Sequence, residues 1–247
     1  MAPLRQQVCG WVNSALAFVY PESCQICARI RATPAECYVC EACRAGIALI
    51  DVPFCQRCGL PYEGEITTDF VCSNCAGLDL YFSSARSAAL AKGVLLEIIH
   101  RYKYQRAFWF EPLLVELLVQ KARSALMLAK WDLIVPVPLH STKQREREFN
   151  QAERLARGMS NALNIPLETG LVRRVVPTPT QTLLNREQRE ANMRRAFGMC
   201  SKNELTRQRV ILVDDVFTTG ATSSACAKVL RGAGASDVCV WTVARGI

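Results

Sequence analysis

Residues 209–222, with the sequence RVILVDDVFTTGAT, constrain the fold of this chain more than any other stretch. Residues 210–213 are an apolar, mostly β-branched run that is too short for a helix, which predicts a strand buried on both faces of a sheet. Two carboxylates and a hydroxyl-rich turn follow, and then a predicted helix over residues 223–230 that Gly232 and Gly234 end. This order is typical of a strand, turn and helix in an α/β domain.

The turn after the carboxylates carries groups that suit a phosphate monoester. Its residues are Thr218, Thr219, Gly220, Ala221 and Thr222. Hydroxyls and free backbone N–H groups at a helix N-terminus favour an anion, and Gly220 lets the backbone approach it closely. Asp214 and Asp215 cannot bind that phosphate, but they can accept hydrogen bonds from ribose hydroxyls. The segment therefore predicts a phosphorylated-sugar site, and the alternative is an ordinary turn in which an Asp-Asp pair caps a helix.

This segment resembles the phosphoribosyl-pyrophosphate (PRPP) loop of the type I phosphoribosyltransferases, a hydrophobic run followed by two acids and a TTG-A-T-like turn. The resemblance implies a Rossmann-like domain with a mostly parallel sheet. It implies that residues 218–222 hold the 5-phosphate of PRPP and that Asp214 and Asp215 are the catalytic pair that holds the ribose hydroxyls. It also implies Mg²⁺ bound together with PRPP, an ion that prefers oxygen ligands.

A second buried strand is predicted over residues 132–139 (DLIVPVPL), followed by a basic loop and a helix that opens at residues 149–151. Ligands bind at the carboxyl ends of strands in doubly wound sheets, and arginines there can clamp a pyrophosphate. The block VPVPLH…REREFNQAE resembles VPVPLH…RxRGFNQAE of the ComF/GntX family, the ComF-type phosphoribosyltransferases that include ComFC. Glu148 departs from that pattern, because the family usually has glycine there. Its side chain and charge either tighten the loop or weaken anion binding.

The positions of the basic residues and the resemblance together predict a set of residues that bind the pyrophosphate or another part of the substrate. The set is Lys103, His140, Arg145, Arg147, Asn150, Gln151, Gln181 and Arg186. Lys103 ends a helix predicted over residues 94–104, where a long cation can reach a phosphate. Gln181 and Arg186 lie in a T-x-x-Q…L-x-R run that resembles the segment covering the active site in related enzymes. Taken singly, the arginines of this run are also typical of a solvated helix.

Eight of the thirteen cysteines form four Cys-x-x-Cys pairs in the N-terminal third of the chain. The pairs are Cys24/Cys27, Cys40/Cys43, Cys55/Cys58 and Cys72/Cys75. The first pair of each set reads CQIC and CQRC, which indicates an internal duplication. Each set supplies the four thiolates of a structural Zn²⁺ site, so two structural zinc ions are predicted. The ComF/GntX resemblance also implies an N-terminal double zinc ribbon.

The first set has a spare thiol, because Cys37 forms a competing Cys-x-x-Cys with Cys40. We expect Cys40 and Cys43 to be the ligands, since that choice makes the two modules match. An iron–sulfur cluster and redox dithiols are the alternatives to zinc. The ribbons either pack on the neighbouring domain or bind nucleic acid or protein.

The chain has 247 residues, half of them hydrophobic, which suits one α/β domain plus a small one. We expect a helix and double zinc ribbon over residues 1–78 and a phosphoribosyltransferase-like domain over 79–247. Residues 11–20 predict an amphipathic helix rather than a signal peptide, and no apolar stretch is long enough to span a bilayer. Metal-type cysteine spacing favours a reducing cytoplasm. Further elements are predicted over residues 87–90 and 237–244 (strands) and 108–128 (helix).

Two functions remain open. The first is a phosphoribosyltransferase, which transfers a pentosyl group from PRPP to an unknown acceptor. The second is a non-catalytic PRPP or nucleotide sensor that binds single-stranded DNA or DNA-uptake proteins, because the ComF family is associated with DNA uptake and natural transformation. The net charge of +8 indicates an anionic partner without separating the two. An aromatic and basic cluster around Lys103 is compatible with base stacking or with helix packing, and consists of Tyr102, Tyr104, Phe108, Trp109 and Arg106.

Overall fold

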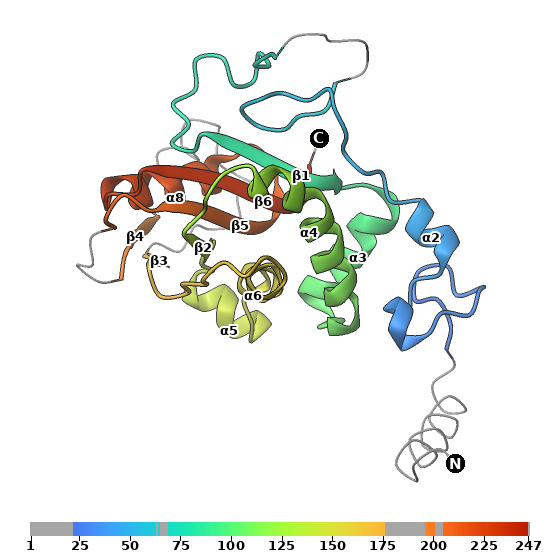
Figure 1. Cartoon of the computed structure of the whole chain (residues 1–247). Helices are drawn as coiled ribbons and strands as arrows, with labels where there is room; N and C mark the ends of the chain where they lie inside the picture. Colours follow the sequence, from blue (N-terminus) through green and yellow to red (C-terminus); the bar gives the residue numbers. More distant parts are fainter. Residues whose placement is uncertain (1–21, 63, 65–68, 176–195, 201–204, 247) are drawn as a thin grey trace, which may run out of the picture.

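The structure is a computed structural model that describes residues 22–62, 64, 69–175, 196–200 and 205–246. Four parallel strands form the central sheet in the order β1-β6-β5-β2 (Figure 1). They are β1 (Ser84–Leu90), β2 (Leu133–Pro136), β5 (Arg209–Phe217) and β6 (Asp237–Arg245). Because parallel strands need crossover connections, helices separate them in the sequence. The predicted α/β class with a mostly parallel sheet is confirmed.

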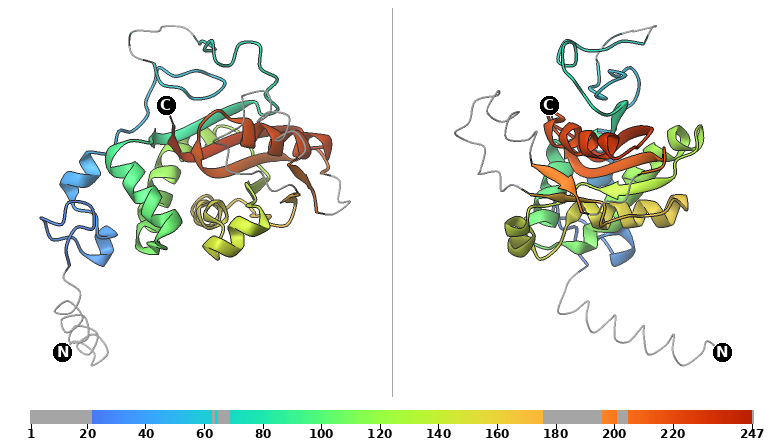
Figure 2. Two further views of the ribbon diagram at one scale, coloured as in Figure 1. Left: turned by 180° about the vertical axis from the view of Figure 1, so that it is seen from behind. Right: turned by 90° about the vertical axis from the view of Figure 1, so that its left-hand side faces the viewer.

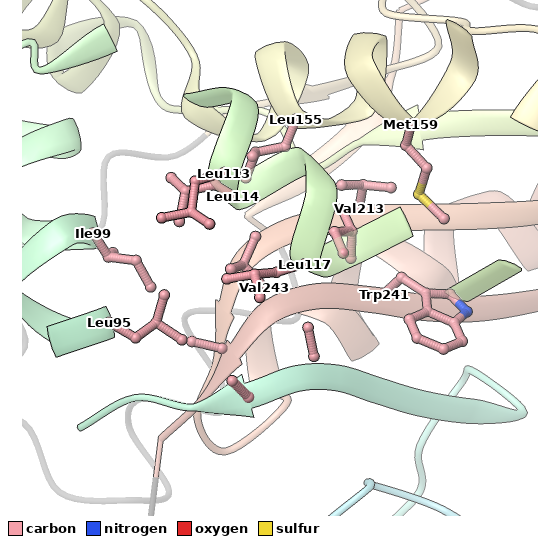
Figure 3. Close-up of a cluster of buried hydrophobic side chains, with 14 of the residues drawn as sticks. Leu95, Ile99, Leu113, Leu114, Leu117, Leu155, Met159, Val213, Trp241 and Val243 are labelled. Carbon is pink, nitrogen blue, oxygen red and sulfur yellow. The ribbon is translucent and has the colours of Figure 1, made fainter. Parts of the chain in front are cut away.

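Helices cover both faces of the sheet (Figure 2). One face carries α3 (Gly93–Tyr104), α4 (Glu111–Met127) and α6 (Gln151–Leu163), and the other carries α8 (Ala221–Gly232). Strands covered in this way read as continuous apolar runs, which explains residues 210–213. Figure 3 shows the larger core, where side chains from α3, α4 and α6 meet the sheet. Among them are Leu95, Ile99, Leu113, Leu114, Leu117, Leu155, Met159, Val213, Trp241 and Val243.

Short elements complete the described chain. They are η1 (Pro34–Glu36), α2 (Glu41–Ala45), η2 (Phe108–Phe110), α5 (Ser141–Arg147), β3 (Val172–Arg174) and β4 (Phe197–Met199). Strands β3 and β4 pair antiparallel and contact α8. Three residues each are too few to show a period, so the sequence did not predict this pair as a separate sheet.

Several predicted elements differ in the structure. The strand expected over residues 132–139 spans only Leu133–Pro136, because prolines at its end cannot donate to the sheet. The strand expected over residues 210–213 continues through both carboxylates to Phe217. It does so because β6 pairs with this extension as well, at Asp214↔Thr242, Val216↔Ala244 and Phe217↔Arg245. The expected basic loop after β2 is the helix α5, which His140 caps. The helix expected over 108–128 begins as η2 and becomes α-helical only where proline occupies its first turn.

The cysteine-rich segment covers the outer edge of the sheet. Ile50 donates its backbone N–H to Ala88 O at 3.0 Å, and Ala85 of β1 donates to Arg57 O at 2.8 Å. An edge strand with open N–H and C=O groups is a site for unwanted pairing, and this segment satisfies several of them. The ribbons were expected either to pack on the neighbouring domain or to bind nucleic acid or protein. The structure shows that they pack on the domain. Residues 11–20 lie outside the described residues, within which no helix is long and apolar enough to cross a membrane.

Candidate functional site

The turn between β5 and α8 has the shape that the sequence predicted for an anion loop. Gly220 has φ +79°, and a Cβ there would lie 2.6 Å from Phe217 Cζ, so only glycine fits. Thr218 and Thr219 are exposed, and Thr219 Oγ1 accepts a hydrogen bond from Ala221 N–H at 3.4 Å. Helix α8 begins at Ala221, so its unpaired N–H groups and two hydroxyls lie at one exposed point. That arrangement suits a phosphate.

The acidic pair lies inside β5, directly before this turn. Neighbouring strand residues point to opposite faces of a sheet, and the two carboxylates accordingly have different surroundings. Asp215 is buried, and its Oδ2 lies 2.5 Å from Lys103 Nζ of α3. Asp214 lies near Cys226 of α8 and Arg174 of β3. Burial raises the pKa of Cys226 and lowers the pKa of Arg174, and the negative charge of Asp214 raises the pKa of each residue.

The pKa of Asp214 is held well above its usual range. Burial is the main cause, and the negative charge of Asp215 is the second. The backbone N–H of Asp215, which donates to Asp214 Oδ1 at 2.9 Å, and the Lys103 charge act in the opposite direction. The pair therefore carries less negative charge than two free carboxylates would.

Lys103 connects the acidic pair to the basic segment after β2. The next residue of α3, Tyr104, accepts a hydrogen bond from Arg147 Nη2 at 3.2 Å, and the Arg147 guanidinium lies 4.9 Å from its ring centroid. Arg147 Nη1 also donates to Gln151 Oε1 at 3.0 Å. Residues of α3, α5, α6 and β5 thus meet at the carboxyl edge of the sheet, where the sequence predicted a ligand.

Besides Lys103 and Arg147, three further residues of the expected substrate-binding set have structural partners. His140 Nδ1 accepts from Thr142 N–H at 3.2 Å and caps α5. Asn150 Oδ1 caps α6, and its Nδ2 donates to Val137 O at 3.1 Å. Gln151 is buried beneath Arg147. These contacts fix the two helices against the end of β2.

Arg145 is exposed and has no polar partner among the described residues, so it can turn toward an anion. Glu148 ends α5 with φ +64°, in the left-handed region that favours glycine, and pairs with Arg106 at 2.7 Å. The glycine that the family usually has at this position matches that backbone conformation. Gln181 and Arg186 lie outside the described residues. Arg174 of β3 lies close enough to Asp214 for that charge to raise its pKa, against the lowering effect of burial, and nothing in its local sequence indicates this.

Each cysteine set forms a group whose sulfur atoms lie within 4.8 Å of one another. The Sγ–Sγ distances are 3.8 Å for Cys24–Cys43 and 3.7 Å for Cys58–Cys72. Four sulfurs about 2.3 Å from a tetrahedral Zn²⁺ would be about 3.8 Å apart, so both groups fit the metal. Cys37 belongs to neither group and is buried in the larger core.

The two groups share the same local hydrogen bonds. Cys40 N–H donates to Cys24 Sγ at 3.4 Å, and Cys72 N–H donates to Cys55 Sγ at 3.3 Å. Burial raises the pKa of both acceptor thiols, but backbone N–H groups outweigh it and lower the pKa to about 6 for Cys24 and about 7 for Cys55. Each group therefore offers a thiolate near neutral pH, which favours metal binding.

Comparison with known proteins agrees with this organisation. A family model described as a double zinc ribbon domain matches residues 15–76. "Competence protein F" of Haemophilus influenzae is 35% identical over 84% of this chain and 90% of its own length. "DNA utilization protein YhgH" of Salmonella typhimurium is 30% identical over 91% of this chain and 97% of its own. "Competence protein ComFC" of Bacillus subtilis is 26% identical, with 84% of each chain covered.

Among solved structures, an adenine phosphoribosyltransferase overlaps 57% of this chain and 74% of its own, with 16% identity and a TM-score of 0.37. That overlap is too weak to bear on the substrate. The curated relatives, in contrast, match along most of both chains. This chain therefore belongs to the ComF/GntX family of competence and DNA-utilization proteins.

Proposed function

We propose that the protein binds PRPP and transfers its phosphoribosyl group to an acceptor. The observation that carries this proposal is the end of β5, where the acidic pair leads directly into a glycine-shaped turn with two exposed hydroxyls at the N-terminus of α8. Residues 218–222 would hold the 5-phosphate. Asp214 and Asp215 would accept hydrogen bonds from the ribose hydroxyls.

Lys103 changes partner in this proposal. In the structure, it forms an ion pair with Asp215. When ribose hydroxyls occupy Asp215, the lysine becomes available for the pyrophosphate, together with Arg145 and Arg147 of α5. Asp214, whose raised pKa disfavours its charge, becomes ionised as ligand donors and cations approach it.

The reaction breaks the bond between C1 of ribose and the pyrophosphate oxygen, which leaves with the electron pair. C1 becomes oxocarbenium-like, and a lone pair of the acceptor forms the new bond to it. The cations of α3 and α5 neutralise the leaving group, while the fixed phosphate and ribose position C1. Mg²⁺, which the two carboxylates suit as hard oxygen ligands, would add charge neutralisation at the pyrophosphate.

We place this activity in competence, and so in DNA uptake, or in DNA utilisation, because one relative is named a competence protein and another a DNA utilization protein. Reduced sites of four cysteines each favour the cytoplasm as its compartment. The alternative is a PRPP- or nucleotide-sensing protein that binds single-stranded DNA without turnover. The aromatic cluster considered for stacking bases supports it only in part. Tyr102 is buried, whereas Tyr104 and Trp109 are exposed and already contact Arg147 and Tyr38. Binding of PRPP without pyrophosphate release for any acceptor would favour the alternative.

The pyrophosphate assignment is tested by comparing two ligands. Calorimetry should show that Arg145→Ala weakens PRPP binding about tenfold or more, because a charge-assisted contact contributes about 1.5–3 kcal/mol. Binding of ribose 5-phosphate, which lacks the pyrophosphate, should not change. Arg157→Ala is the matched control, since Arg157 is exposed on α6 and pairs with Glu153. Equal weakening of both ligands by Arg145→Ala would contradict the assignment.

A further inference from the structure

Arg245, the last residue of β6, contacts both the phosphate loop and the second cysteine group. It is buried, with 5% of its surface exposed. Its Nη1 donates to the backbone oxygens of Phe217, at 3.1 Å, and of Thr218. Its Nη2 donates to Cys58 Sγ at 3.8 Å. One guanidinium therefore joins the backbone where residues 218–222 begin to a zinc-site sulfur.

The second cysteine group is the counter-charge that Arg245 requires. Arginine stays protonated in proteins, and a buried charge without an opposite charge is strongly destabilising. Among the described residues, no carboxylate forms an ion pair with Arg245. Four thiolates around Zn²⁺ carry a net charge of about −2. Through Cys58, that charge lies beside the guanidinium, as a charge-assisted hydrogen bond requires.

Aromatic packing holds Arg245 to the loop. Its guanidinium lies 4.7 Å from the ring centroid of Phe217, which is the strand partner of Arg245. The ring of Phe82 meets Phe217 edge-on at 5.9 Å, and the tight approach of Gly220 closes a further side. All four cysteines of the second group belong to the same hydrophobic cluster as Phe82 and Phe217. A shift of Arg245 would therefore move the start of the phosphate loop.

The first cysteine group has no such connection. Its buried members, Cys24 and Cys40, form a separate small cluster with Ala32. The arginine beside it, Arg101 of α3, donates to Gln25 O at 2.6 Å and pairs with Glu97. In the described part of the chain, none of these contacts reaches residues 217–222. The two groups are alike in ligands but differ in what surrounds them.

We propose that Arg245 is a positioning residue that couples zinc at Cys55, Cys58, Cys72 and Cys75 to phosphate binding at residues 218–222. The coupling rests on the proposed PRPP site. With zinc bound, Arg245 holds the Phe217 and Thr218 carbonyls so that the loop N–H groups face the phosphate. Without zinc, the dianionic partner is lost and the loop is no longer held. Linkage is reciprocal, so PRPP must also retain the second zinc.

The test measures how zinc divides at equilibrium between the full-length, zinc-loaded protein and a chelating dye, with and without PRPP and Mg²⁺. Saturating PRPP should raise the affinity of the wild type for one of its two zinc ions about fivefold or more, the usual lower range of coupling between sites. In Arg245→Lys, that affinity should be lower and PRPP should not raise it, because one amine cannot reach both the sulfur and the carbonyls. PRPP binding measured by calorimetry should weaken to a similar degree.

Arg101→Lys, beside the first group, is the matched control and should leave PRPP binding and its effect on zinc unchanged. The wild-type measurement needs no variant, so a variant that fails to fold does not remove the test. A zinc affinity that is insensitive to PRPP, in a wild type that binds PRPP, overturns the coupling alone. A wild type that does not bind PRPP at all overturns the proposed function and the coupling with it.

Discussion

Asp214 is a carboxyl group whose surroundings oppose its negative charge. Burial, followed by the charge of Asp215, raises its pKa in the folded protein. The folded state therefore binds this proton more tightly than the unfolded chain does. Stability conferred by that proton is complete at low pH and is lost as the pH rises from the ordinary Asp value through the raised one. Binding sites commonly lower the stability of the folded protein, because groups placed for a ligand, such as this buried carboxylate, are unfavourable without it.

Asp214→Asn should stabilise the ligand-free protein, because the amide keeps the Oδ1 that accepts the Asp215 N–H but carries no charge. We expect a gain of about 1 kcal/mol at about pH 8 and a smaller gain at about pH 5, measured by thermal unfolding. The control is Asp79→Asn, an exposed carboxylate, which should change little at either pH. A loss of stability, or a gain that does not depend on pH, would contradict the account of Asp214.

Cys37 and Cys40 separate a packing role from a ligand role. Cys40 is a member of the first group of four sulfurs, whereas Cys37 is buried in the core that includes Val39 and Ile47. Cys40→Ser should therefore lower the zinc content from about two to about one per chain, and Cys37→Ser should keep both zinc ions. Elemental analysis of the purified variants measures this. A zinc lost from Cys37→Ser, with Cys40→Ser unaffected, would show that the ligands are assigned wrongly.

At the scale of elements, the β5–α8 turn depends on a backbone conformation that only glycine adopts easily. Gly220→Ala should lower the free energy of unfolding by about 1–2 kcal/mol, because an L-residue at φ +79° is strained and its Cβ meets Phe217. PRPP binding should weaken as well.

Gly232→Ala, at the other end of α8, is the matched control, since its added Cβ has open space and its φ is not positive. That change should be neutral or stabilising by up to about 1 kcal/mol in denaturant unfolding. Equal effects of the two substitutions would mean that the turn geometry does not limit stability.

Periodicity predicted the core elements well because burial determines them. Residues 210–213 and 237–244 are apolar on both faces, and both are strands of the buried sheet. The sequence could not show that β5 continues through its charged pair. There the strand is held by backbone pairing to β6 and by Lys103, which is more than a hundred residues away in the sequence. Local polarity wrongly predicted that the strand ends before the carboxylates.

The basic segment after β2 also shows that local polarity alone does not determine secondary structure. Its charges predicted a loop, but His140 caps a helix there and Glu148 ends it in a left-handed conformation. The residues that could meet a substrate were still identified by type and order, including Lys103, Arg145 and Arg147. Arg174 and Arg245 were not, because their contacts arise only when distant strands come together.

At the scale of the whole molecule, the cysteine-rich segment is part of the structure of the carboxyl-terminal domain. Its backbone pairs with β1, and its second cysteine group shares a hydrophobic cluster with the strand that carries the acidic pair. We propose to divide the chain at residues 1–78 and 79–247 by sequence, while expecting the two parts to unfold together. Many small metal-bound modules fold only with their metal, so zinc loss should affect more than the ribbon.

The central claim is that the end of β5 binds PRPP, and calorimetric titration of the zinc-loaded protein with PRPP and Mg²⁺ tests it most directly. The wild type should bind with a Kd on the order of micromolar, about −8 kcal/mol. The double variant Asp214→Asn/Asp215→Asn should remain folded and lose most of that affinity, because it keeps the phosphate loop but not the ribose-binding charges. A folded, zinc-loaded wild type that does not bind PRPP, or a double variant that binds it equally well, would contradict the claim.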